Sequence, residues 1–108
     1  GSDGRGSLFN ISCALQYAIN NSEVDIINMS FGWYVDNSEI IANLLNDAGL
    51  SKVLITSAGN KTNNNDFLPH FPSGYGSPNL VSIAAHDTVA GELAPYSNYG
   101  FHSVDLQL

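Results

Sequence analysis

The sequence has 108 residues, of which 44% are hydrophobic, so it can form one modest domain with a small core and is too apolar for wholesale disorder. Ten acidic residues against three Lys and Arg give a net charge of −7, which argues against nucleic acid and anionic membranes as partners. No apolar run approaches the ~20 residues of a membrane-spanning helix, and the single cysteine, Cys13, cannot form an internal disulfide.

The first half of the chain predicts two helices and two strands. Ser7 can cap a helix that ends at residues 20–22, and residues 24–29 then read as a strand followed by a loop at 33–36. A second helix begins at Asn37 or Ser38 and ends at Gly49, before a buried strand at Val53. The first helix carries its apolar residues at helical spacing at Leu8, Ile11, Leu15, Ala18 and Ile19. The second helix is predicted to bury Ile40, Ile41, Leu44, Leu45 and Ala48.

The second half of the chain predicts shorter elements. Residues 80–85 and 104–106 read as strands. Before them the sequence predicts a solvated Asn-rich loop at 61–66 and an irregular Pro-rich stretch at 68–78, and between them it predicts turns at 86–91 and 96–100.

The order of these elements predicts an α/β fold with a parallel β-sheet and flanking helices, in which residues 53–57 are central. Parallel sheets need cover on both faces, and two helices are too few for four strands. We therefore expect part of the cover to be missing, with exposed apolar surface and self-association as consequences.

The end of the central strand is the first candidate site. Ser57, Ala58 and Gly59 leave room for a ligand beside the backbone, and ligands of open α/β sheets bind outside the carboxyl ends of strands. Asn60 follows with a side-chain amide that suits a developing oxyanion. The alternative is that Asn60 only forms a turn, since Asn tolerates left-handed backbone.

Other candidate sites are poorly supported by the residues. His70, His86 and His102 lie 16 residues apart, without the close pairs typical of metal sites, so no metal site is predicted. The glycine-rich lead-in at residues 1–6 matches no nucleotide-binding fingerprint. It reads either as a flexible linker or as a backbone ledge for an extended peptide.

Four segments taken together resemble the subtilisin-like serine proteases, the subtilases (peptidase family S8). Their order and spacing agree over essentially the whole chain, and the resemblance rests on the combination, because each motif alone is weak. The segments are residues 1–7, residues 25–32 (DIINMSFG), residues 57–60 (SAGN) after an aliphatic strand, and the set of residues 71–73, 80–85 and 96–100.

The resemblance implies a role for each segment in peptide binding. Asn60 matches the oxyanion-hole asparagine of the family. One wall of the primary specificity pocket corresponds to Ser30, Phe31 and Gly32, and the opposite wall to Ser57, Ala58 and Gly59. The outer edge that pairs with the N-terminal side of the substrate corresponds to Gly4, Arg5 and Gly6, and a more distant apolar pocket is bordered by Leu8, Ile11 and Phe31.

The catalytic triad of the family is not among these residues. Subtilases use Asp, His and Ser in that chain order, and the resemblance places the first two before Gly1 and the nucleophile after Leu108. Residues 1–108 are therefore expected to be the central portion of a peptidase domain and to be inactive alone. Trp33 stands where small residues are common in the family, so the pocket mouth is expected to differ.

The leading hypothesis is thus a fragment of a serine endopeptidase whose partners are a peptide or protein substrate and the remaining segments of its domain. The family implies no cofactor and a secreted or cell-surface location; it is compatible with a structural calcium ion in the parent enzyme, to which no residue here is assignable. The alternatives are a non-catalytic peptide-binding or structural module with the same fold, and an unrelated flavodoxin-like α/β domain in which Asn60 is only a turn residue.

Overall fold

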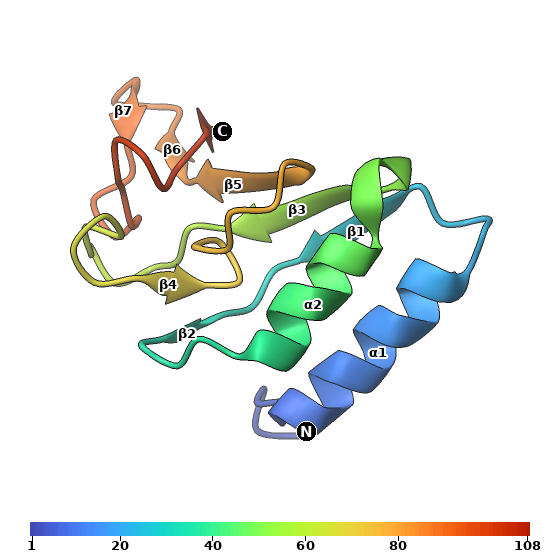
Figure 1. Ribbon diagram of the computed structural model, residues 1–108. Helices are drawn as coiled ribbons and strands as arrows, with labels where there is room; N and C mark the ends of the chain where they lie inside the picture. The colour runs from blue at the N-terminus through green and yellow to red at the C-terminus, as the bar shows by residue number, and fades with distance from the viewer.

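A four-stranded parallel sheet forms the centre of the computed structural model, which describes residues 1–108 (Figure 1). Its strands stand in the order β1 (Ile26–Met29), β3 (Val53–Ser57), β5 (Leu80–Ala84) and β8 (Leu106–Gln107), and every neighbouring pair is parallel. The predicted α/β class and the parallel sheet are confirmed. Since β3 pairs with β1 on one side and with β5 on the other, its predicted central position is confirmed as well.

Two helices pack side by side on one face of this sheet (Figure 1). Helix α1 (Leu8–Asn20) begins after Ser7, whose hydroxyl oxygen accepts a hydrogen bond from the Asn10 N–H, as an N-cap does. Helix α2 (Glu39–Asp47) begins after Ser38, which caps the Ile41 N–H in the same way. A short 3₁₀ turn, η1 (Gly49–Ser51), follows α2, and Gly49 adopts the left-handed φ of +55° that ends a helix.

The core lies between these helices and the sheet. It contains Leu15, Ile27, Met29, Ile41, Leu44, Leu45, Ala48, Leu54, Phe71 and Tyr75. The opposite face of the sheet has no helix over it in these residues, and Ile26 and Val53 are 60% and 45% exposed there. The expected shortage of cover is therefore a property of this one face.

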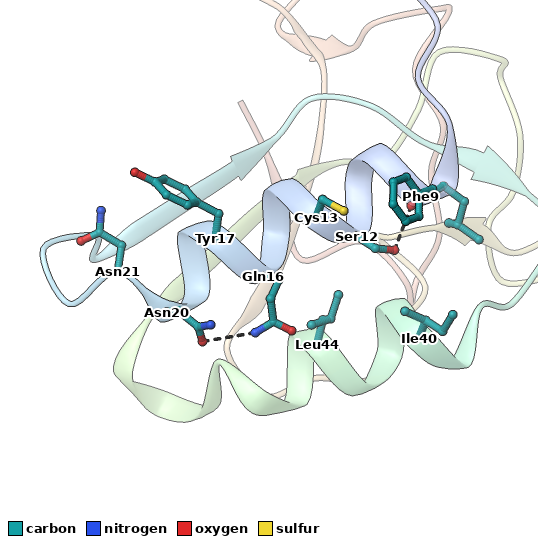
Figure 2. Close-up of a pocket in the computed structure, with 10 residues that line it drawn as sticks. Phe9, Ser12, Cys13, Gln16, Tyr17, Asn20, Asn21, Ile40 and Leu44 are labelled. Carbon is teal, nitrogen blue, oxygen red and sulfur yellow. Dashed lines mark hydrogen bonds between the residues drawn. The ribbon is translucent and has the colours of Figure 1, made fainter.

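The prediction that α2 buries Ile40 is wrong. Ile40 is 61% exposed and borders a groove of about 1050 Å³ between α1 and α2 (Figure 2). Figure 2 shows Leu44 beside it, with Phe9, Cys13 and Tyr17 along α1 on the other side. The predicted stripe was too wide because two adjacent residues of a helix lie about 100° apart, so Ile40 points outward while Ile41 is fully buried.

Three two-residue strands replace predicted loops and turns, and a fourth, at residues 92–93, lies where no element was predicted. Strand β2 (Trp33–Tyr34) pairs antiparallel with β4 (His70–Phe71), and β6 (His86–Asp87) pairs antiparallel with β7 (Glu92–Leu93). The last strand covers Leu106–Gln107 instead of residues 104–106. A strand of two residues has no measurable periodicity, and the β2–β4 pair joins distant segments, so only the folded chain reveals it. No helix of the structure is long and apolar enough to span a bilayer.

Leu54→Ala should destabilise the protein by about 2–5 kcal/mol, because Leu54 is fully buried in the central strand and the smaller side chain leaves a cavity. Leu50→Ala removes the same atoms from a side chain that is 83% exposed, and it should cost about 0.5 kcal/mol or less. Urea unfolding of the two variants measures the difference. Equal destabilisation would contradict the burial of β3.

Candidate functional site

The segments that follow β1 and β3 leave the sheet next to each other. Met29, the last residue of β1, is in register with Thr56 of β3, so both strands end at the same edge of the sheet. Ser30, Ser57, Gly59 and Asn60 line a common depression of about 280 Å³ at this edge. The two stretches that the resemblance identifies as opposite walls are thus neighbours in space.

Asn60 is one of the residues that line this depression. Asn60 is exposed, and its side-chain amide makes no hydrogen bond within residues 1–108. The amide is therefore available as a donor at the carboxyl end of a central strand. An Asn that only supported a turn would form a side-chain hydrogen bond with a nearby backbone group. Asn64 does so, because its Oδ1 accepts a hydrogen bond from the Asp66 N–H at 3.0 Å.

The wall made by Ser57, Ala58 and Gly59 is held by backbone contacts. The Ala58 N–H donates to the Ile83 carbonyl at 2.8 Å, which extends the β3–β5 ladder by one residue, and Ala58 is fully buried. Gly59 has a φ of +108°, and a Cβ there would lie 2.4 Å from Asn98 Nδ2. Only glycine fits this position, because any side chain would collide with a buried amide that cannot move away.

Asn98 is a fully buried polar residue that packs against Gly59 of this wall. Its Oδ1 accepts hydrogen bonds from the backbone N–H groups of Lys61 (2.8 Å) and Asn63 (3.1 Å). Its own N–H donates to the Gly59 carbonyl at 2.8 Å. One residue therefore fixes the backbone on both sides of Asn60.

The amide nitrogen of Asn98 completes the connection. Nδ2 lies 2.9 Å from the Ala58 carbonyl, 3.0 Å from Asn65 Oδ1 and 2.8 Å from the Tyr34 hydroxyl. Asn65 is also buried and donates from Nδ2 to the same Ala58 carbonyl at 2.8 Å. Asn63 Nδ2 donates to Asn65 Oδ1 at 2.7 Å. We call Asn63, Asn65 and Asn98 the asparagine network.

The sequence did not identify this network. Residues 61–66 were predicted to be a solvated loop and residues 96–100 a turn, yet Asn65 is 4% exposed and Asn98 is fully buried. That prediction is wrong for Asn65, because the returning segment at Asn98 covers the loop. The one signal in the sequence was the accumulation of Asn, a residue whose amide can satisfy loop backbone groups.

A second groove lies beside the first wall. Gly4, Arg5 and Gly6 line it together with Phe31 and Gly32, in a volume of about 710 Å³. The predicted outer edge and the first wall therefore line the same groove. The predicted apolar border, Leu8, Ile11 and Phe31, lines the same groove.

His70 was given no site role from the sequence, yet it lies between the walls. Its side chain is 4% exposed, and burial lowers its pKa below 6.5. Nδ1 lies 2.7 Å from Ser73 Oγ, but no hydrogen bond joins either side chain to a carboxylate and both are buried, so this contact is not a catalytic pair.

Two other titratable groups, Asp66 and His86, have hydrogen-bond partners within residues 1–108. Asp66 accepts hydrogen bonds from the N–H groups of residues 101–103, and the nearby Ser103 hydroxyl, together with these N–H groups, lowers the pKa of its carboxyl group. His86 Nδ1 lies 2.5 Å from Gln107 Nε2. No three His, Cys, Asp or Glu side chains gather in a group that could hold a metal ion, so no residue is assigned to calcium.

Comparison with known proteins points to one family. A family model described as the subtilase family matches residues 1–107. Subtilisin-like protease 2 of Plasmodium falciparum is 35% identical over 111 residues, which cover 94% of this chain and 8% of that protein. The thermostable alkaline protease of Halalkalibacterium halodurans is 34% identical over 100 residues, covering 91% and 25%. The chain thus spans only 8% to 25% of the length of these curated relatives.

Solved structures agree with this match. A lanthipeptide protease superposes with a TM-score of 0.79 at 27% identity, over 97% of this chain and 34% of that chain. A cold-adapted subtilisin-like serine proteinase superposes with a TM-score of 0.77 at 24% identity, over 96% and 36%, and at this identity it shows the fold alone.

Asn98→Ala should destabilise the protein strongly, because it leaves the Lys61 and Asn63 N–H groups without their acceptor. Each buried backbone group that loses its partner costs about 1–3 kcal/mol. Asn64→Ala is the matched control in the same loop, since its side chain makes one local contact, and it should cost about 1 kcal/mol or less. Urea unfolding midpoints compare the two, and similar losses would show that the asparagine network does not support the loop.

Proposed function

The chain belongs to the subtilase family, and we propose on this basis that it forms the substrate-binding part of a serine endopeptidase that hydrolyses peptide bonds. Asn60 carries this proposal. Its unpaired amide stands at the strand-end edge, beside a depression lined by Ser30, Ser57 and Gly59, where a peptide carbonyl between the two walls would bring its oxygen within reach. A donor fixed there stabilises the negative charge of a tetrahedral intermediate.

In this proposal the two walls bind the backbone of an extended substrate. Ser30, Phe31 and Gly32 form one side of the primary pocket, and Ser57, Ala58 and Gly59 form the other. The N-terminal side of the peptide runs along the groove at Gly4, Arg5 and Gly6. Binding by strand edges uses main-chain hydrogen bonds, so it accepts many sequences and leaves selectivity to the side-chain pockets.

The chemistry of bond cleavage requires a nucleophile and a base that we assign to other segments of the protease domain. None of the three histidines has both a serine and a carboxylate as side-chain partners. The oxyanion donor alone cannot form a covalent intermediate. By family we further expect the complete protein to be secreted or attached to the cell surface.

Residues 1–108 by themselves should therefore not hydrolyse peptides. A fluorogenic peptide assay on this polypeptide, with a serine-directed phosphonate as the label, measures both turnover and an activated serine. The complete protein is the positive control. Turnover by residues 1–108 together with labelling of one of their serines would overturn the assignment of the triad to other segments.

Asn60→Ala in the complete protein should lower kcat far more than it raises KM, because the amide meets the oxygen fully only once that oxygen carries charge. The expected loss is about 10²–10³ in kcat, a magnitude taken from the oxyanion donor of a subtilisin, which belongs to this family. Asn60→Leu should behave in the same way, since the lost donor is the cause.

Asn64→Ala is the control for these two variants, because Asn64 is in the following loop and contacts no wall. Steady-state kinetics on the three proteins decide the point. A near-normal kcat for Asn60→Ala, with a loss for Asn64→Ala, would return Asn60 to a turn residue. A complete protein that binds peptides without cleaving them would instead support the non-catalytic module.

A further inference from the structure

The imidazole of His70 occupies the space between the two walls of the proposed primary pocket. A Cβ added at Gly32, in the first wall, would lie 2.2 Å from His70 Nε2 and 2.3 Å from Cε1. A Cβ added at Gly59, in the second wall, would lie 3.2 Å from Cδ2 of the same ring. The outer end of one ring, formed by Cε1, Nε2 and Cδ2, thus lies where a side chain at either glycine would have to be, and only 4% of the residue is exposed.

The ring is also fixed in this position. Strand β4 pairs with β2, which places His70 opposite Tyr34, and the two rings meet edge-on with centroids 5.1 Å apart. The Ser73 hydroxyl donates to the His70 carbonyl at 3.0 Å, so its oxygen is free to accept from Nδ1, which lies 2.7 Å away. This arrangement puts the ring proton on Nδ1 and leaves Nε2 as an acceptor beside Gly32.

A large side chain cannot enter between the walls unless this ring moves. Moving it would break the hydrogen bond to Ser73 and separate the ring from Tyr34, and the backbone on both sides is fixed by strand pairing and by the asparagine network. A small side chain needs no such displacement. The floor that it would meet is an imidazole with an acceptor nitrogen.

We propose that His70 closes the primary pocket, so that the protease cleaves after small residues such as Gly, Ala or Ser and discriminates against large apolar ones. This inference rests on the proposed function, and it goes further by naming the class of substrate. His70 is then a specificity-determining residue, distinct from Asn60, which acts on the oxygen of the scissile bond whatever the side chain.

The test uses the complete protein and two fluorogenic peptides that are identical except for Ala or Phe before the cleaved bond. The native protein should give a kcat/KM at least tenfold higher for the Ala peptide. His70→Gly should raise the Phe-to-Ala ratio of kcat/KM by about tenfold or more, the scale on which pockets discriminate by size. His70→Gln keeps most of the volume and should keep the preference for Ala, which guards against misfolding of the glycine variant.

His102→Gly is the matched control, because His102 is exposed on a loop away from both walls, and its ratio should stay at the native value. Equal cleavage of the two peptides by the native protein would overturn the role of His70 and leave the proposed function standing. An unchanged ratio in His70→Gly would do the same. Failure of the complete native protein to cleave either peptide would overturn the proposed function and this inference with it.

Discussion

The buried amide of Asn98 is the contact on which the geometry of the strand-end edge depends. It bonds the Lys61 and Asn63 backbone on one side of Asn60 and the Ala58 carbonyl on the other, and its N–H holds the Gly59 carbonyl. The loop at residues 61–66 is polar, so it has little apolar surface that could pack against the rest of the protein. Buried hydrogen bonds are the means by which such a segment takes one conformation, because each bond left unmade costs the desolvation of its partner.

The same amide connects the second wall to the first. Nδ2 reaches the Tyr34 hydroxyl, and Tyr34 lies in β2, whose antiparallel partner β4 carries His70. The two walls, the ring between them and the loop after Asn60 therefore form one connected polar and aromatic unit. Gly32 and Gly59 belong to it for a steric reason, since side chains at these positions would meet His70 and Asn98. Rigid backbone support of this kind suits the oxyanion role that we propose for Asn60, because a donor that must reorganise during reaction stabilises charge less well.

The apolar core supports this unit from the other side. Both helices cover one face of the sheet, and their buried residues meet Ile27, Met29 and Leu54 beneath the strand ends. Phe71 joins the same core from β4, next to His70, and the centroid of its ring lies 4.7 Å from that of Tyr75. The opposite face exposes Ile26 and Val53. Parallel sheets are covered on both faces in complete domains, so this face is surface that a further segment or a second molecule can cover.

The sequence by itself determined the α/β class, the two capped helices, the central position of residues 53–57 and the placing of Asn60 at a strand end. Each of these follows from local information: apolar periodicity, cap residues, or small residues after a β-branched run. Only the family resemblance identified residues 30–32 and 57–59 as the two walls of one pocket, and the pairing of β1 with β3 in the folded chain brings them together. The family resemblance supplied the roles of these residues.

Only the tertiary structure decided which polar residues are buried and what fills the space between the walls. Asn65 and Asn98 lie 33 residues apart, and nothing local distinguishes them from the exposed asparagine at position 60. Nothing in the sequence distinguishes His70 from His86 and His102. The pairing of β2 with β4 places His70 alone beside Gly32 and Gly59. Ile40 and Ile41 are chemically identical, and their opposite exposures follow from the direction in which α2 packs. In each case the deciding contact joins segments far apart in the chain, so its energy is absent from any local pattern.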